Sequence, residues 1–214
     1  VALGMAVESG APVVIACTSG TALLNYAPAV AEAYYRHVPL IVVSADRPEQ
    51  WIDRDDSQTI RQPGVLSNIV KRSVHLSADL ETVADGSWRA NLLINEALSA
   101  AISGVPGPVH INIAFDTPLA ETAEFPASEG RYIPTLTAPA KLEKVQVAEV
   151  AATLRTAKAL IVCGFMAPDK ARDRELAHMA AQPNVAVIAE STANVHARGV
   201  IDAPALLDQL FFLI

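Results

Sequence analysis

The sequence is short of cysteine and of aromatic side chains. Its 214 residues include two cysteines, and Phe, Trp and Tyr together make up 5% of the chain. Cys17 and Cys163 both lie inside apolar runs that predict strands, and we interpret them as two buried free thiols of a cytosolic protein rather than as a disulfide. No run of 18 apolar residues occurs, so the sequence predicts no membrane insertion.

Positive charge is also scarce. Lys and Arg number 16 against 23 Asp and Glu, which gives a net charge of −7. A protein that binds nucleic acid needs a basic face for the phosphate backbone, so nucleic acid is not predicted as the main partner. The five histidines lack the spacing of metal ligands, and TSGTA (18–22) is not the Gly-x-Ser-x-Gly elbow of hydrolases. A zinc site and a serine-hydrolase triad are therefore not supported.

Short apolar runs rich in Val and Ile alternate with helical patterns along the chain. The runs that predict strands are 11–18, 39–45, 71–76, 107–115, 159–165 and 184–190. The segments that predict helices are 1–10, 22–37, 81–103, 147–158 and 168–182. This alternation is typical of α/β proteins with mainly parallel sheets flanked by helices. Because proline inside a helix costs about 3 kcal/mol, we expect Pro28 in the first turn of a separate helical segment.

A proline-rich stretch divides the pattern into two consecutive α/β units. Small and charged residues show neither helical nor strand periodicity there, and they are separated by Pro118, Pro126, Pro134 and Pro139. We therefore predict domains at 1–117 and 143–214, joined by a linker at 118–142. The chain starts inside a helical pattern without methionine and ends on an apolar run, so we interpret it as a piece of a longer protein.

The segment TSGT (18–21) joins the first predicted strand to a helix. Free backbone N–H groups and the helix dipole at such a point can receive an anion or a polar ring edge. A plainer interpretation is a helix N-cap, in which Ser19 or Thr18 closes the first turn and Gly20 allows the bend. The local pattern leaves both interpretations open and favours the cap.

A dense polar segment follows the second predicted strand. Eight of the 16 residues from Asp46 to Arg61 are charged, against 18% of the whole chain. Ligands of open parallel sheets bind beyond the carboxyl ends of the strands, and this segment leaves such an end. An ion pair with Asp46 can hold Arg47 toward a carboxylate substrate, while Gln58 can both donate and accept hydrogen bonds. The alternative is a solvated loop whose charges pair with one another and contribute little.

Four stretches, in this order, resemble the thiamine-diphosphate enzymes: CTSGTALLNYAPAVAEA, PLIVVSADRPEQWID, SQTIRQPG and GPVHINIAFDTPL. The first three are most similar to the 2-succinyl-5-enolpyruvyl-6-hydroxy-3-cyclohexene-1-carboxylate (SEPHCHC) synthases of menaquinone biosynthesis. GPVHINI is shared more widely, among pyruvate-oxidase-like enzymes. The resemblance runs clearly from Val1 to about Leu119 and more loosely beyond.

The resemblance implies a function for a complete enzyme. Members of this family decarboxylate 2-oxoglutarate on thiamine diphosphate and add the resulting succinyl carbanion equivalent to isochorismate. They have three domains, of which this chain corresponds to most of the pyrimidine-binding domain and part of the central domain. The glutamate that activates the cofactor is expected upstream of VALGMA (1–6), and Glu8 does not replace it because it follows that segment. The fragment alone is therefore predicted to be inactive.

Particular residues also match family positions. Arg47 matches the arginine on the isochorismate side, Gln58 the catalytic glutamine that contacts the intermediate, and Ser57 its usually Asn-like neighbour in substrate binding. The residues that match the cofactor-binding loop are Thr18, Ser19, Gly20, Thr21 and Asn25. DRDD (53–56) departs from the family's Gly-Ala type sequence, and its negative charge repels a dicarboxylate unless arginines offset it. The arginines available to do so are Arg47, Arg54 and Arg61.

The resemblance implies thiamine diphosphate and Mg²⁺ or Mn²⁺ as cofactors, with the metal site in a C-terminal domain absent from this chain. The implied partners are 2-oxoglutarate, isochorismate and further copies of the protein, as a homodimer or homotetramer in the cytoplasm. Two alternatives remain. One is another thiamine-diphosphate 2-oxo-acid decarboxylase or acetolactate-type enzyme, and the other is a non-catalytic interaction module that uses the apolar end FFLI (211–214).

Overall fold

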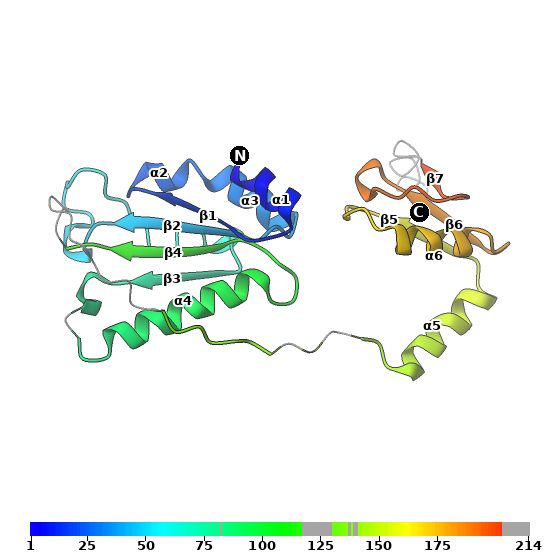
Figure 1. The fold of residues 1–214 in the computed structure, drawn as a ribbon. Helices are drawn as coiled ribbons and strands as arrows, with labels where there is room; N and C mark the ends of the chain where they lie inside the picture. The colour runs from blue at the N-terminus through cyan, green and yellow to red at the C-terminus, as the bar shows by residue number, and fades with distance from the viewer. Residues whose placement is uncertain (82, 117–129, 137, 139–140, 203–214) are drawn as a thin grey trace. The chain divides into compact units, whose positions relative to one another are not determined.

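The computed structural model describes residues 1–81, 83–116, 130–136, 138 and 141–202. The chain divides into two units, Val1–Ala138 and Pro139–Ile214, and each contains a parallel sheet with flanking helices (Figure 1). The predicted α/β class is therefore confirmed. The apolar end at 206–214 lies outside the described residues. Within the described ranges, no helix is both long and apolar enough to cross a membrane.

The first unit is built on four parallel strands in the order β1-β2-β4-β3. The strands are β1 (Val13–Cys17), β2 (Leu40–Asp46), β3 (Arg72–Leu76) and β4 (Val109–Ala114). The α-helices are α1 (Ala2–Ser9), α2 (Thr21–Leu24), α3 (Ala27–Tyr35) and α4 (Gly86–Ile102). The described part of the unit also contains the short 3-10 helices η1 (Glu49–Trp51), η2 (Ser67–Ile69) and η3 (Ala78–Glu81).

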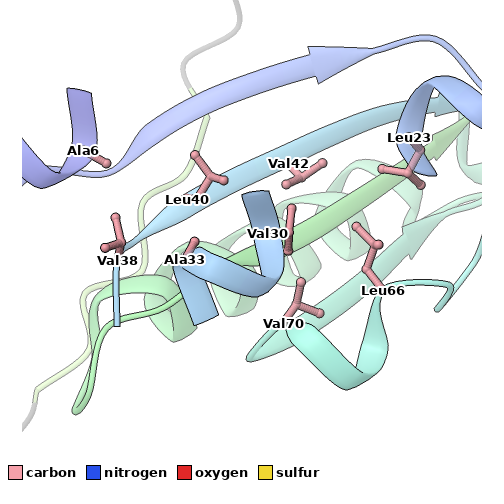
Figure 2. Packing of buried hydrophobic residues seen from close by; sticks show 9 residues of the cluster. All are labelled: Ala6, Leu23, Val30, Ala33, Val38, Leu40, Val42, Leu66 and Val70. Atoms are coloured by element: carbon pink, nitrogen blue, oxygen red, sulfur yellow. The ribbon is translucent and has the colours of Figure 1, made fainter. Parts of the chain in front are cut away.

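Helices cover both faces of this sheet. α1, α2 and α3 lie on one face and α4 lies on the other (Figure 1). Alternate residues of β2 enter the two cores, because side chains of a strand point to opposite faces in turn. Leu40 and Val42 pack with α1–α3 and η2, as Figure 2 shows, while Ile41 packs on the α4 side. This two-sided burial explains the nearly continuous apolar sequence of the strand.

The face toward α1–α3 changes character along the strands. Near their amino ends it is apolar, with Leu40 and Val42 buried. Near their carboxyl ends, parallel register brings polar residues of three neighbouring strands together: Ser44 pairs with Asn112, and Asn112 pairs with His75. The polar end of this face is where the candidate site lies.

The structure refines several predicted helices. The segment 22–37 forms two helices, α2 and α3, with Pro28 in the first turn of α3 as predicted. The long helix predicted from 81 begins at Gly86. A Cβ at that position would come within 1.5 Å of the Leu80 carbonyl oxygen, so the start of α4 fits closely against η3.

Residues 131–135 of the predicted linker are extended and lie against α4. The Asn95 amide donates to the carbonyl of Arg131 at 2.8 Å and accepts from the N–H of Ile133 at 2.8 Å. The Arg131 N–H donates to the Asn91 side chain at 3.1 Å. The predicted bounds 1–117, 118–142 and 143–214 stay predictions, since residues 117–129, 137 and 139–140 lie outside the described residues.

The second unit contains a parallel sheet in the order β5-β6-β7. Its elements are α5 (Lys144–Thr156), β5 (Ala159–Cys163), α6 (Lys170–Ala180), β6 (Val185–Ala189), η4 (Ser191–Ala193) and β7 (Ile201–Asp202). Asp169 caps α6 by accepting from the N–H groups of Ala171 and Arg172, which lowers its pKa. Both cysteines are free; Cys163 is buried as predicted, whereas Cys17 is only half-buried because β1 is an edge strand.

Candidate active site at the carboxyl ends of the strands

The TSGT segment turns from β1 into α2 through Gly20. Gly20 is the N-cap residue of α2, with φ 76° and ψ −138°, and no side chain caps this helix. The interpretation in which Ser19 or Thr18 closes the first turn is therefore wrong. Only glycine adopts this backbone conformation without strain, so the turn itself requires Gly20. Ser19 is buried, while the other three residues predicted to bind the cofactor are exposed: Thr18, Thr21 and Asn25.

Gly20 lies directly against the predicted catalytic residue. A Cβ on Gly20 would sit 2.8 Å from the Gln58 carbonyl oxygen and 3.3 Å from its Cα, so the two backbones touch. Gln58 itself has φ 57°, a left-handed conformation that is uncommon outside glycine. Its side chain and that of Ser57 are exposed. The structure thus brings the predicted cofactor loop and the predicted substrate-binding residues together.

Beneath this contact lies Gln62, the buried member of an otherwise exposed stretch, 61–65. Its side chain is fully buried. Oε1 accepts from the Gly20 N–H at 2.8 Å, and Nε2 donates to the Ala45 carbonyl and to Asn112 Oδ1, both at 2.7 Å. One amide therefore joins the segment after β1 to the ends of β2 and β4.

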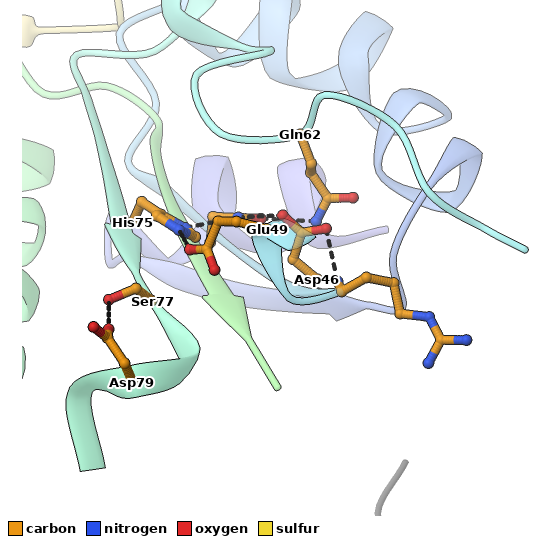
Figure 3. A network of polar contacts seen from close by, with 8 residues as sticks. Asp46, Glu49, Gln62, His75, Ser77 and Asp79 are labelled. Carbon is orange, nitrogen blue, oxygen red and sulfur yellow. Dashed lines mark hydrogen bonds and ion pairs between the residues drawn. The ribbon is translucent and has the colours of Figure 1, made fainter. Parts of the chain in front are cut away.

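Asn112 carries the network on toward Asp46. Asn112 Nδ2 donates to Asp46 Oδ2 at 2.7 Å, and the other Asp46 oxygen accepts from the Arg47 N–H at 2.8 Å (Figure 3). Asp46 is 3% exposed, and its burial raises the pKa of the carboxyl, although both hydrogen bonds act in the opposite direction. The network holds a buried acid at the end of β2.

His75 forms the β3 side of the same network. Its Nδ1 accepts from Asn112 Nδ2 at 3.0 Å, which places the ring proton on Nε2, where it donates to Glu49 at 2.7 Å (Figure 3). His75 thereby connects β3 to Asn112 in β4 and to Glu49 in η1 through its two ring nitrogens.

His110 is fully buried next to Ser44. His110 Nε2 and Ser44 Oγ are 2.7 Å apart, and His110 Nδ1 is 3.3 Å from Ser73 Oγ. Ser44 donates to Asn112 Oδ1 at 2.8 Å, so His110 Nε2–H donates to Ser44. Burial lowers the pKa of His110 to about 4. The ring is neutral at physiological pH.

Arg47 pairs with Asp56, not with Asp46. Arg47 Nε lies 3.2 Å from Asp56 Oδ2, whereas the neighbouring carboxylate of Asp46 accepts the backbone N–H of Arg47. The predicted ion pair with Asp46 is therefore wrong, because the backbone reaches that buried carboxylate first. A second pair joins Arg61 Nε to Asp53 at 2.8 Å.

These two pairs bear on both interpretations of the polar segment. They place arginines beside two of the three aspartates in DRDD, which offsets the negative charge there. Charges of the segment do pair with one another, as in a solvated loop, and the side chains of the Arg61–Asp53 pair are 84% and 58% exposed. The buried network under the segment, however, is not a property of a solvated loop.

The exposed side chains among the residues predicted to bind the cofactor carry no charge. Thr18 and Thr21 of the TSGT segment offer hydroxyl groups, and Asn25 at the end of α2 offers an amide. Among the residues that the structure describes, no group of three His, Cys, Asp or Glu side chains is arranged to hold a metal ion.

The buried part of the site was not predicted from the sequence. Gln62 lies in the quoted stretch SQTIRQPG without an assigned role, and no role was assigned to His110 either. One pattern in the sequence could have predicted this buried network. Polar residues alternate with apolar ones near the ends of two strands: Ser44 and Asp46 in β2, and His110 and Asn112 in β4. In each pair the two side chains share one face of the sheet.

The described geometry agrees with comparisons to known proteins. Residues 1–65 match the family model of the thiamine pyrophosphate enzyme, N-terminal TPP binding domain. These 65 residues of the chain are similar to the N-terminal domain of the thiamine pyrophosphate enzymes. The match contains the TSGT segment, Arg47, Ser57 and Gln58, and it ends just after Gln62.

Three proteins similar to this chain carry one name, 2-succinyl-5-enolpyruvyl-6-hydroxy-3-cyclohexene-1-carboxylate synthase. The protein of Porphyromonas gingivalis is 43% identical over 91% of this chain and 34% of its own length. That of Desulfotalea psychrophila is 45% identical over 95% of this chain and 38% of its own. That of Bacteroides thetaiotaomicron is 52% identical over 55% and 21%. The chain thus spans little more than a third of the length of the relatives that match nearly all of it.

Proposed function

We propose that the complete protein decarboxylates 2-oxoglutarate and adds the remaining four-carbon unit to isochorismate, giving SEPHCHC. The observation that carries this proposal is the contact between Gly20 and Gln58, because it joins the two segments to which the family resemblance assigns cofactor and substrate binding. The name shared by the three relatives supports the same reaction. Since no relative reported above carries another name, a different 2-oxo-acid decarboxylase and a non-catalytic module are not favoured.

In this proposal Arg47 binds a carboxylate of isochorismate. Asp56 holds the guanidinium through Nε, and a guanidinium has five N–H donors, so donors remain for a substrate. Gln58 and Ser57 present exposed polar side chains beside the cofactor loop and orient the reacting molecule. The left-handed backbone of Gln58 directs this part of the loop against Gly20.

Thiamine diphosphate, when bound, supplies the carbon centre on which a 2-oxo acid loses carbon dioxide. Thr18, Ser19, Gly20, Thr21 and Asn25 are the residues of this chain proposed to hold its pyrimidine ring. The activating glutamate and the Mg²⁺ or Mn²⁺ site are proposed to lie in parts of the protein beyond this sequence. The complete enzyme is proposed to act in the cytoplasm as a homodimer or homotetramer, and the fragment alone to be inactive.

The test uses the full-length protein with thiamine diphosphate, Mg²⁺, 2-oxoglutarate and isochorismate. Loss of isochorismate absorbance that requires every component supports the proposal. Decarboxylation of a different 2-oxo acid, without consumption of isochorismate, would keep the cofactor and overturn the substrates. No reaction with any 2-oxo acid would overturn the enzymatic function altogether.

A further inference from the structure

Gln62 is anchored more completely than either of the substrate-binding residues nearby. Its side chain is fully buried, and its amide bonds to groups on three separate segments of the first unit. A fourth, longer contact of the amide joins Nε2 to Ser44 Oγ at 3.2 Å. A buried amide with these bonds fixes the relative positions of the segments, because moving one segment away costs a buried hydrogen bond.

The segment from Gln58 to Gln62 is held at both ends by Gly20. At one end the Gln58 backbone packs on the Gly20 Cα, and at the other the Gln62 side chain accepts the Gly20 N–H. The position of the Gln58 side chain relative to the cofactor loop therefore depends on the Gln62 hydrogen bond.

The same amide is connected to Arg47 through two further residues. Gln62 donates to Asn112, Asn112 donates to Asp46, and Asp46 accepts the Arg47 N–H. Every link in this series is 2.7 or 2.8 Å long. Gln62 thus helps to set the direction in which the chain leaves β2. That direction decides where the Arg47 side chain begins.

We propose that Gln62 is a positioning residue, which sets Gln58 and Arg47 at the correct separation and orientation for isochorismate. It acts through Gly20 on one and through Asn112 and Asp46 on the other, and it does not itself touch substrate. This inference rests on the proposed function, because it concerns the binding of the second substrate.

The experiment compares Gln62→Met and Gln62→Glu with the wild type in the full-length enzyme. Methionine keeps the volume of the side chain and removes every hydrogen bond. We expect kcat/KM for isochorismate to fall about tenfold or more, the scale of a lost buried hydrogen bond, largely through a higher KM. Decarboxylation of 2-oxoglutarate without isochorismate should fall less than kcat/KM for isochorismate, since Arg47 acts on the second substrate and Gln62 reaches the cofactor loop only through the Gly20 N–H.

Gln62→Glu adds a second measurement, the pH dependence of kcat/KM for isochorismate, which a merely structural role of Gln62 would not change. The introduced carboxyl faces two acceptors, the Ala45 carbonyl and Asn112 Oδ1, and can donate to one of them only when protonated. We expect its kcat/KM for isochorismate to recover relative to Gln62→Met as the pH is lowered from about 8 to about 6. Gln182→Met, which changes an exposed glutamine of the second unit, is the matched control and should leave both reactions unchanged.

The outcomes separate this inference from the proposed function. If the wild-type enzyme does not consume isochorismate, the proposed function is wrong, whatever the variants do. A wild type that consumes isochorismate, with a folded Gln62→Met variant of equal kcat/KM, overturns the positioning role. If Gln62→Met does not fold, the pH series of Gln62→Glu decides, and a profile parallel to that of the wild type counts against the inference.

Discussion

The backbone N–H of Gly20 donates to Gln62 Oε1 at 2.8 Å, across 42 positions of sequence. This bond connects the segment that leaves β1 with the polar segment that leaves β2. Both segments emerge at the carboxyl ends of parallel strands, where ligands of open α/β sheets bind. Because the bond is buried, its loss would cost more than the bond of an exposed loop.

Replacing Gly20 by alanine should destabilise the protein and disturb the site. The new Cβ meets the Gln58 carbonyl oxygen at 2.8 Å, and alanine disfavours the backbone conformation at φ 76°. We expect the free energy of unfolding to fall by about 1–3 kcal/mol, measured by urea denaturation. Gly4→Ala is the control, since nothing lies within 4 Å of that position in α1 and alanine favours the helix by about 0.5–1 kcal/mol. Equal stability of the two variants would contradict the close contact.

His110 should make the protein less stable in acid. Its pKa is lowered from 6.5 to about 4 in the folded state, so between these values the unfolded chain binds a proton that the folded chain does not. Stability from this group is complete above about pH 6.5 and is lost as the pH falls toward 4, by about 3 kcal/mol in all. The raised pKa of Asp46 opposes this trend, because its folded form takes up a proton more readily.

The comparison that isolates His110 is the stability of the wild type and of His110→Gln, measured by urea denaturation from pH 7.5 to 4.5. Asp46 is present in both proteins and its contribution largely cancels. We expect the variant to be less stable at pH 7.5 but to lose less stability on acidification. Parallel curves would show that His110 does not titrate as its buried position requires.

Arg47 and Arg61 should differ in their effect on substrate binding. Both pair with an aspartate of DRDD, but the Arg47 side chain is 32% exposed and lies at the end of β2, while that of Arg61 is 84% exposed. We expect Arg47→Ala to raise KM for isochorismate in the full-length enzyme about tenfold or more, through loss of a charge-assisted hydrogen bond. Arg61→Ala should change KM less than about twofold, since exposed pairs contribute little. A larger increase in KM for Arg61→Ala than for Arg47→Ala would contradict the assignment of Arg47 to substrate binding.

Asn95 should protect the extended segment at 131–135 from proteolysis. Its side chain is 8% exposed and bonds to the backbone of Arg131 and of Ile133. In Asn95→Ala we expect trypsin to cleave after Arg131 about fivefold faster or more, because the segment must leave α4 before it enters the protease. The rate of cleavage is measured by mass spectrometry. Asn68→Ala, at an exposed position in η2, is the control. Unchanged cleavage in Asn95→Ala would mean that other contacts hold the segment.

Periodicity in the sequence was sufficient to predict the parallel α/β architecture. The run around Leu40–Asp46 is apolar on both faces, and β2 is covered on each side as this pattern predicts. The run around Val13–Cys17 has the same pattern, but β1 is an edge strand and Val14 stays 59% exposed. Proline chemistry placed Pro28 correctly in the first turn of α3. These features depend on neighbouring residues alone. The family motifs located the TSGT and polar segments for a different reason, since their resemblance to known enzymes carries information that local physics does not.

The tertiary structure alone decided which polar residues are buried and which partners they have. No local rule distinguishes Gln62 from Gln58, four positions earlier, yet one is enclosed and the other exposed. Likewise, Arg47 follows Asp46 in sequence but pairs with Asp56, because the backbone N–H occupies the nearer carboxylate. Hydrogen bonds between residues 40 to 70 positions apart depend on how parallel strands align. That alignment is set by the packing of two cores on opposite faces of the sheet, which no short stretch of sequence contains.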